Sequence, residues 1–270
     1  MKLAISNLAW DKKEDSKVLK LLHKYNVKGI EIACSKVWPD PIKASRSEIK
    51  EYRNFWEKND IQIIATTSLL FGHPEFQLFE SKDVRSKMYD YLSNMVSVSS
   101  LLGAKAMVFG SPKNRKRNGL LNKEAKTIAK DFFGKMGNLA KKYNISFAIE
   151  PLPLIYGTDF LNSTDETIKF IKSINHPNLG INFDTGSLTA SDEISEEFIR
   201  SILPYTKHAH ISEPLLKQIP AGETDHNKFS KILKKLNYKG WLSIEMPLGT
   251  EINHLKTINS TLEFTTSIYN

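Results

Sequence analysis

The sequence predicts an α/β protein that forms a single (β/α)8 barrel, or TIM barrel, over residues 1–270. Three observations support this fold class. Eight short β-like runs alternate with amphipathic segments, which is the pattern of a parallel sheet covered by helices. The length of 270 residues is close to the roughly 250 of a typical barrel of this kind. No Pro/Gly/Ser-rich linker interrupts the alternation, so one domain is expected.

The eight expected strands are short runs of apolar and β-branched residues. In chain order they are Leu3–Ser6, Gly29–Ala33, Gln62–Thr67, Ala104–Phe109, Ser146–Ile149, Gly180–Phe183, His208–Ile211 and Leu242–Ile244. Long loops follow the third and fifth of these strands, on the side where barrels of this kind keep their active sites.

The expected helices lie between these runs and carry apolar residues at helical spacing. The clearest cases are Val18–Leu22, Ile49–Trp56 and Ile128–Leu139. A further helix is expected to begin at Ser163 or Thr164, because a hydroxyl there can accept from the first free backbone N–H groups.

Three helix-to-strand turns repeat one pattern, in which an Asn stands just before the strand: Asn26, Asn144 and Asn237. Asn adopts the left-handed backbone conformation that ends a helix. The recurrence is expected from a repeated ancestral unit and also from general turn chemistry.

Charge and cysteine content constrain the partners and the location. The net charge of +8 comes from Lys and Arg spread along the chain, which favours a solvated surface over a nucleic-acid-binding face. The one cysteine, Cys34, excludes an intrachain disulfide and fits a reducing, cytoplasmic compartment. We find no signal peptide and no run of about 18 apolar residues, so no membrane association is expected.

Four acidic or imidazole residues fall at the ends of four successive β-like runs. They are Glu150, Asp184, His210 and Glu245, separated by 34, 26 and 35 residues. Because each interval is close to one strand-helix unit, the four side chains should meet at one face of the barrel. Oxygen and nitrogen donors without a thiolate suit Mn²⁺, Mg²⁺, Co²⁺ or Zn²⁺. The sequence therefore predicts a site for one divalent metal ion.

Strand alternation predicts further polar groups beneath the ligands. His208, Asn182 and Ser243 each precede a ligand by two residues, so they face the same side, one layer deeper. They are expected to orient the ligands, although His208 can equally be an ordinary hydrogen-bonded histidine of the barrel core. Glu31, in the second strand, is expected to point inward, to pack at the rim or to form an ion pair.

Five motifs resemble patterns of one known superfamily. They are V-F-G-S-P at Val108–Pro112, A-I-E-P-L at Ala148–Leu152, L-N-S at Leu161–Ser163, N-F-D-T-G at Asn182–Gly186 and A-H-I-S-E at Ala209–Glu213. Nearly the whole chain is thus similar to the xylose isomerase-like TIM-barrel superfamily of sugar phosphate isomerases and epimerases. Its members include ketose epimerases, hydroxypyruvate and inosose isomerases, a dehydroshikimate dehydratase and endonuclease IV.

The resemblance implies a metal-dependent isomerase or epimerase of a sugar, sugar phosphate or sugar acid. It makes Glu150, Asp184, His210 and Glu245 the ligands of one divalent ion, with Mn²⁺ as the first choice. Glu150 and Glu245 would also transfer the proton through a metal-stabilised enediolate. The alternatives are a lyase of the dehydroshikimate dehydratase type with the same metal site, an endonuclease IV-like phosphodiesterase, and a sugar-binding barrel without catalysis.

The residues near the expected metal site depart from the rare-ketose 3-epimerases of this superfamily. Ser187 stands where those enzymes carry a His, and Tyr156 where they carry a second Glu. Their sugar-contacting Arg after the seventh strand has no clear counterpart, although Lys217 is nearby. An endonuclease would need additional histidines, and only His73 follows the third strand. A free ketohexose and nucleic acid are therefore both disfavoured as substrates.

Candidate substrate contacts lie in the loops after the strands. Lys113 and Arg115, in a basic run after the fourth strand, would hold an anionic substituent, and the alternative is a solvated turn. Trp10 and Trp38 follow the first two strands and would form an apolar wall against a sugar ring. Tyr156 is a further expected contact.

Two more polar residues have competing interpretations. Glu213, three residues after His210, is expected to orient a substrate hydroxyl or to cap the next segment. His226 is expected at the start of a helix. The expected partner is a small carbohydrate, either neutral or anionic. The oligomeric state is left open between a monomer and a homo-oligomer, because no interface can be read from the sequence.

Overall fold

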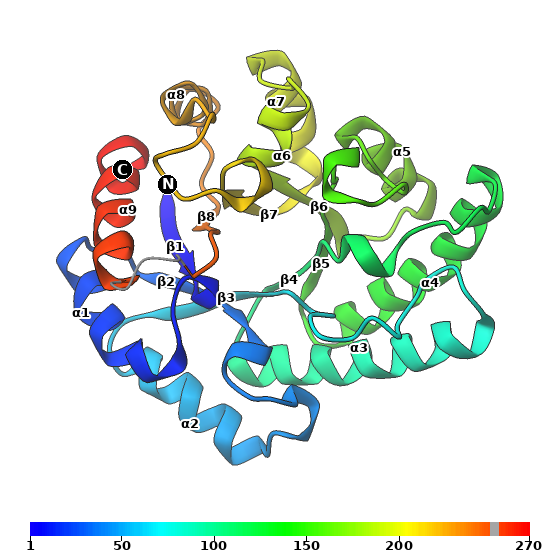
Figure 1. Ribbon diagram of the computed structural model, residues 1–270, viewed down its shortest axis with the longest axis horizontal. Helices are drawn as coiled ribbons and strands as arrows, with labels where there is room; N and C mark the ends of the chain where they lie inside the picture. The colour runs from blue at the N-terminus through cyan, green and yellow to red at the C-terminus, as the bar shows by residue number, and fades with distance from the viewer. Residues whose placement is uncertain (249–253) are drawn as a thin grey trace.

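The computed structural model describes residues 1–248 and 254–270, and its centre is a closed barrel of eight parallel strands in chain order (Figure 1). The strands are β1 (Lys2–Ser6), β2 (Gly29–Ala33), β3 (Gln62–Thr67), β4 (Ala106–Phe109), β5 (Ser146–Ile149), β6 (Leu179–Asp184), β7 (Thr206–Ile211) and β8 (Trp241–Ile244). This arrangement confirms the predicted (β/α)8 barrel.

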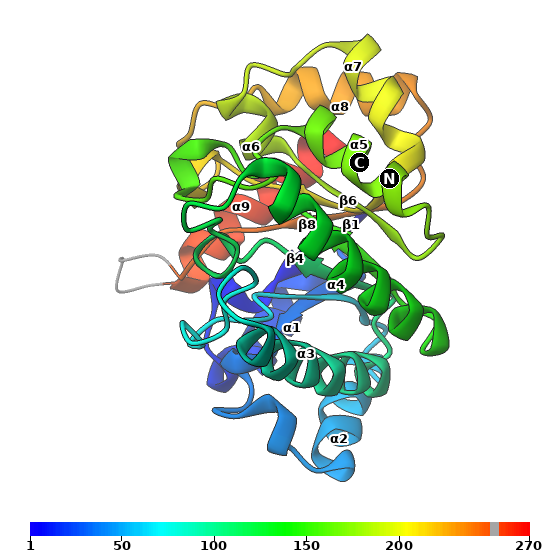
Figure 2. The same cartoon turned by 90° about the vertical axis from the view of Figure 1, so that its right-hand side faces the viewer.

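Helices surround the barrel on all sides (Figure 1). They are α1 (Asp15–Lys24), α2 (Arg46–Glu57), α3 (Lys82–Leu102), α4 (Asn122–Lys142), α5 (Thr164–Ile174), α6 (Thr185–Ala190), α7 (Glu196–Ile202), α8 (His226–Lys235) and α9 (His254–Tyr269). The long helices α3 and α4 lie side by side (Figure 2), and α9 contacts α1 so that the ring of helices closes. Among the described residues, no helix has both the length and the apolar character needed to span a bilayer.

The strand boundaries agree closely with the sequence prediction. β2, β3 and β5 have the predicted bounds, and the others differ by one or two residues. The prediction for the Asn turns is also confirmed, because Asn26, Asn144 and Asn237 have φ values of 53°, 55° and 54°. Ser163 caps α5, since its hydroxyl accepts a hydrogen bond from Glu166 N over 3.2 Å.

Side-chain alternation along the strands separates two kinds of core. In β2, Ile30 and Ile32 join the large apolar core shared with the helices, and Glu31 between them points into the barrel. Small apolar residues of the barrel interior, such as Ala4 and Ala106, form a second cluster against Trp241. The apolar contacts thus anchor the strands, while polar side chains occupy the interior toward the carboxyl ends.

Candidate metal centre

The strands bring four ligand side chains to the carboxyl ends of β5 to β8. Asp184 ends β6 and lies beside His210 of β7 in the strand register. Glu150 and Glu245 come directly after β5 and β8, and their N–H groups extend the ladders by hydrogen bonds of 3.1 and 2.9 Å to carbonyl oxygens of β4 and β7. The backbone at all four positions is therefore held by the sheet.

The donor atoms of these four side chains converge on one point. All of them lie within 4.8 Å of one another. His210 Nδ1 is 3.1 Å from Glu245 Oε2 and 3.7 Å from both Glu150 Oε1 and Asp184 Oδ2. Ligand atoms about 2.0–2.2 Å from a common ion have separations of this order. The geometry fits one divalent ion.

The electrostatics of the cluster also favour a bound cation. Burial and the neighbouring charge of Glu150 raise the pKa of Asp184, and burial raises the pKa of Glu245. Burial opposes a charged His210, but the carboxylates of Glu245 and Glu31 outweigh it and raise the pKa of the imidazole. Three carboxylates face one imidazole here, so without a metal the cluster retains protons. A divalent ion would replace them.

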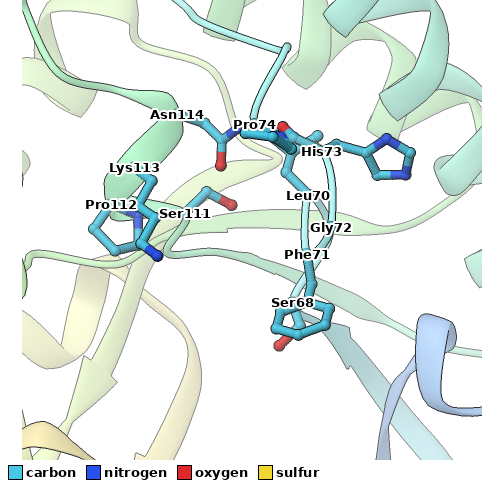
Figure 3. Close-up of a pocket in the computed structure, with 10 residues that line it drawn as sticks. All are labelled: Ser68, Leu70, Phe71, Gly72, His73, Pro74, Ser111, Pro112, Lys113 and Asn114. Carbon is cyan, nitrogen blue, oxygen red and sulfur yellow. Dashed lines mark hydrogen bonds between the residues drawn. The ribbon is translucent and has the colours of Figure 1, made fainter.

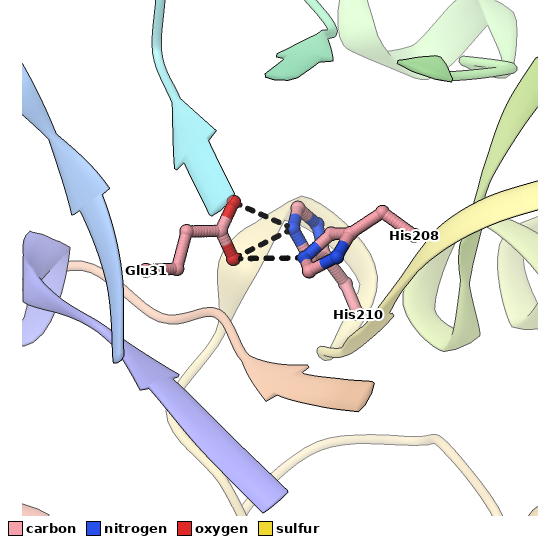
Figure 4. Close-up of side chains that lie close together, drawn as sticks. All are labelled: Glu31, His208 and His210. Carbon is pink, nitrogen blue, oxygen red and sulfur yellow. Dashed lines mark hydrogen bonds and ion pairs between the residues drawn. The ribbon is translucent and has the colours of Figure 1, made fainter. Parts of the chain in front are cut away.

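Glu31 orients the imidazole ligand from below (Figure 4). Its carboxylate lies 3.1 Å from His208 Nε2 and 3.1 Å from His210 Nε2, and it is fully buried. Burial disfavours the carboxylate, but His210 and His208 outweigh that and lower the pKa of Glu31. An ionised carboxylate only accepts hydrogen bonds, so both histidines donate from Nε2. In the neutral form of His210, which metal binding requires, the Nδ1 lone pair then faces the three carboxylates of the cluster.

Two other side chains hold the carboxylate ligands. Asp184 accepts from Ser187 N over 2.6 Å and from Ser212 Oγ over 2.7 Å. Asn182 Nδ2 donates to Glu150 Oε1 over 3.1 Å and lies 3.0 Å from His210 Nδ1. Asn182 thus contacts two candidate ligands directly, as its position in the strand predicted, whereas His208 packs its ring edge-to-face against His210, with centroids 5.1 Å apart, and shares Glu31 with it.

Buried polar atoms around the cluster lack partners in the described part of the chain. Asn182 Oδ1 and Ser243 Oγ are inaccessible to solvent and make no hydrogen bond. Such atoms are rare in folded proteins unless a water or an ion satisfies them. Together with the donor set, they support a site built for an ion and its bound solvent.

A cleft of about 180 Å³ opens above the metal cluster. Glu150, Asp184 and Glu245 form its floor, and Tyr156 lines its wall. The Tyr156 hydroxyl accepts a hydrogen bond from the Leu215 amide over 3.1 Å, and burial raises the pKa of this phenol to about 12. Tyr156 is therefore a neutral hydrogen-bonding group beside any molecule in the cleft.

The expectation that Trp10 and Trp38 contact a substrate is wrong. Trp10 is completely buried, and its Nε1 donates to Asp15 Oδ1 over 2.7 Å. Trp38 is buried against Tyr52, with ring centroids 5.5 Å apart. Both rings pack into the apolar core shared with the first helices, so neither presents a face to the cleft.

Arg115 and Glu213 are also corrected, because each is used inside the protein. Arg115 is fully buried, and its Nη2 donates to the backbone oxygen of Glu150 over 2.8 Å. Glu213 is buried as well and accepts from Thr224 N over 2.9 Å, with His226 Nε2 at 3.0 Å from its other oxygen. The interpretation of Glu213 as a local cap is thus favoured over a substrate contact.

Two features of the centre were missed by sequence reasoning. The role of Glu31 depends on a contact with His210 across 179 positions of sequence, which no local pattern reveals. Gly110 follows β4, and a Cβ atom built there would collide with Glu150 Oε2. The absence of a side chain at Gly110 therefore makes room for the ligand, and the V-F-G-S-P motif was the available signal.

A family model described as the xylose isomerase-like TIM barrel matches residues 19–268. The chain belongs to this family. The model covers most of the barrel, from α1 to α9, and it includes the four metal-site residues.

Several sugar epimerases resemble the chain. It is 25% identical over 107 residues to a ketose 3-epimerase of Arthrobacter globiformis, a match that spans 40% of this chain and only 37% of that relative. The structure of 3-keto-D-glucoside 4-epimerase from E. coli aligns with a TM-score of 0.82, 13% identity and 99% coverage of both chains. D-psicose 3-epimerase from Clostridium cellulolyticum H10 aligns with a TM-score of 0.81, 16% identity and 100% coverage of both. At these identities the structural matches show a shared fold.

Proposed function

We propose that this protein is a divalent-metal-dependent isomerase or epimerase of a sugar, sugar phosphate or sugar acid. The supporting observation is the placement of Glu150 and Glu245. Both carboxylates reach the metal cluster and both line the same cleft. Two carboxylates at different sides of one substrate can remove a proton and return it. The epimerases that share the fold act on sugars and are consistent with this proposal.

The proposed proton transfer uses the two carboxylates in sequence. When bound, the metal would polarise a sugar carbonyl and its neighbouring hydroxyl, which acidifies the adjacent C–H bond. One carboxylate takes that proton, and the other returns a proton to the opposite face for epimerisation or to the next carbon for isomerisation. Asn182 fixes Glu150 through Oε1, so Glu150 Oε2 is available for proton transfer.

We propose one ion per chain, with Mn²⁺ as the first choice and Mg²⁺, Co²⁺ or Zn²⁺ as alternatives. Three carboxylates favour a hard ion, while the imidazole suits a borderline one, and Mn²⁺ accepts both. Elemental analysis of the purified protein tests the number directly. Three ions per chain would instead support the endonuclease alternative. His73, which an endonuclease site would need, contacts Glu75 and stacks on Phe76.

The decisive experiment is incubation in D₂O with Mn²⁺ and a panel of keto sugars, sugar phosphates and sugar acids. Carbon-bound deuterium at a retained stereocentre is expected for one class. Glu150→Gln and Glu245→Gln should each abolish the exchange, while Glu263→Gln, an exposed acid of α9, should leave it unchanged. Failure of all panel members to exchange would contradict the proposal. Loss of water from the substrate would identify a dehydratase with the same centre.

A further inference from the structure

Figure 3 shows a second cavity, of about 470 Å³. It shares lining residues with the metal cleft. One wall is the 68–74 loop after β3, and the other is the 111–114 segment after β4. Ser68, Ser111 and Pro112 line both cavities, so the two spaces are neighbours on the same face of the barrel. The metal cleft alone, at about 180 Å³, is smaller than the ~300–1,000 Å³ of typical ligand pockets. The second cavity brings the combined site into that range.

The walls of this second cavity are tied together by hydrogen bonds. Asn114 is buried, and its Nδ2 donates to the backbone oxygens of His73 and Phe76 over 2.8 and 2.7 Å. The backbone carbonyl oxygen of Asn114 accepts a hydrogen bond from Leu78 N over 2.9 Å. These bonds join the loop after β3 to the segment after β4. The cavity is therefore a formed feature of the barrel face.

The backbone at the junction of the two cavities is held in an uncommon conformation. Ser68 and Ser111 have φ values of 53° and 43°, the left-handed region that residues other than Gly rarely adopt. Each stands one or two positions beyond a strand end and borders both spaces. Such conformations concentrate where proteins bind ligands.

The lining of the second cavity combines apolar faces with one free cation. Phe71 is 73% exposed, and Pro74 and Pro112 add further apolar surface. Lys113 is exposed across the cavity from the 68–74 loop (Figure 3). No carboxylate of the described residues lies within ion-pair distance of its ammonium group. An exposed aromatic ring offers a stacking surface to a second ring, and an unpaired lysine attracts an anion.

We propose that this second cavity binds a ring-containing, acidic group attached to the reacting sugar, so that the substrate is an anionic sugar conjugate. The inference rests on the proposed function of the metal centre. Phe71 would stack on the attached ring, and Lys113 would pair with its carboxylate or phosphate. In a glycoside the anomeric carbon is locked, so the carbonyl that acidifies the C–H bond must lie elsewhere in the sugar ring.

The test uses four 3-keto-β-D-glucosides that differ only in the attached group: methyl, phenyl, 4-carboxyphenyl and 4-phosphophenyl. Deuterium exchange with Mn²⁺ gives kcat/KM for each. We expect phenyl to exceed methyl about tenfold through ring stacking, and the acidic compounds to exceed phenyl. Phe71→Ala should remove the higher kcat/KM of the phenyl compound relative to the methyl compound. Lys113→Ala should remove only the additional increase in kcat/KM that the acidic groups give. Comparison of the carboxylate with the phosphate identifies which anion is preferred.

Two surface variants serve as controls. Leu121→Ala removes an equally exposed apolar side chain outside the cavity, and Lys116→Ala removes an exposed lysine from the same basic run. Neither should change the ranking of the four compounds. Equal kcat/KM for methyl and 4-carboxyphenyl compounds, or equal losses on both in Phe71→Ala, would overturn the proposal.

Failure of this inference can be separated from failure of the proposed function. Binding of the 4-carboxyphenyl compound to the Mn²⁺-loaded protein is measured in parallel by calorimetry. Exchange of the methyl compound without preferential binding of the acidic one would refute the second cavity as a substrate site and leave the metal chemistry standing. Binding that weakens in Lys113→Ala, without exchange of any compound, would support the cavity and contradict the isomerase.

Discussion

Replacement of Glu31 by Gln tests how the barrel interior prepares its imidazole ligand. The Glu31 carboxylate receives N–H groups from His208 and His210, both at 3.1 Å. Gln keeps the size and removes the charge. Its amide has one acceptor oxygen and one NH₂ donor. The two carboxylate oxygens of Glu31 lie 3.2 and 3.1 Å from His210 Nε2, so in either orientation of the Gln amide its NH₂ group meets this nitrogen. The NH₂ group then favours a neutral histidine whose proton has moved from Nε2 to Nδ1.

In His210 that proton would lie on the atom that faces the metal. We therefore expect Glu31→Gln to weaken Mn²⁺ binding by about 10- to 100-fold, the range found when partners of metal ligands are removed. This loss corresponds to about 1.4–2.8 kcal/mol of binding free energy. Calorimetric titration of the metal-free protein with Mn²⁺ measures it. The number of protons released on Mn²⁺ binding should change as well, because in the variant the proton on His210 Nδ1 must leave before the metal can bind there. Titrations in two buffers of different ionisation enthalpy measure this number.

A matched control separates this effect from a general loss of stability. Glu213 forms a similar buried pair with His226, at 3.0 Å, and does not belong to the metal cluster. Glu213→Gln should lower the thermal midpoint without altering Mn²⁺ affinity. If Glu31→Gln folds and binds Mn²⁺ within twofold of the unchanged protein, the argument that Glu31 sets the His210 tautomer is refuted.

Three further predictions concern the fold and the centre. Gly110→Ala places a Cβ against Glu150 Oε2 and should lower turnover about 100-fold by displacing the carboxylate. Gly134→Ala in α4 meets only Ile174 at 3.9 Å and should keep full activity, so equal activity of both variants would contradict the steric argument. Asp15 has its pKa raised to about 6 by burial, so wild-type stability should fall relative to Asp15→Asn as the pH rises from about 4 to 6. The folded state holds the proton in that interval while the unfolded state releases it, and the difference approaches about 3 kcal/mol above pH 6. A pH-independent difference in denaturant unfolding would exclude this assignment. Finally, Mn²⁺ at 100 times its Kd should stabilise the protein by about 2.7 kcal/mol, seen as a higher thermal midpoint that a chelator reverses. An unchanged midpoint would argue against a metal site formed in the folded state.

The strands and their turns could be predicted because their signals are local. Asn26, Asn144 and Asn237 each mark a helix end by their own backbone preference. The alternation along β7 likewise places His208 and His210 on one side without reference to the rest of the chain. For the same reason the strand-end positions of Glu150 and Asp184 could be recognised from the sequence alone.

Predictions about loop side chains failed where the direction of the side chain mattered. Trp10 and Arg115 both follow strands on the catalytic side, yet both point into the protein. Trp10 finds an acceptor in Asp15, and Arg115 finds the backbone oxygen of Glu150. Loop conformation depends on contacts between distant segments, and sequence spacing does not report them. Lys113, only two positions before Arg115, is exposed, so two basic residues of one loop have opposite orientations that their spacing does not predict.

The sequence by itself determined the barrel and the row of candidate ligands, since both depend on periodic patterns in which each strand end repeats the same position. Only the tertiary structure decided how the ligands are prepared and what surrounds them. Glu31 meets His210 across the barrel, Gly110 leaves space for Glu150, and the loops after β3 and β4 enclose a second cavity. These features require closure of the sheet, which brings residues far apart in the chain within a few ångströms of one another.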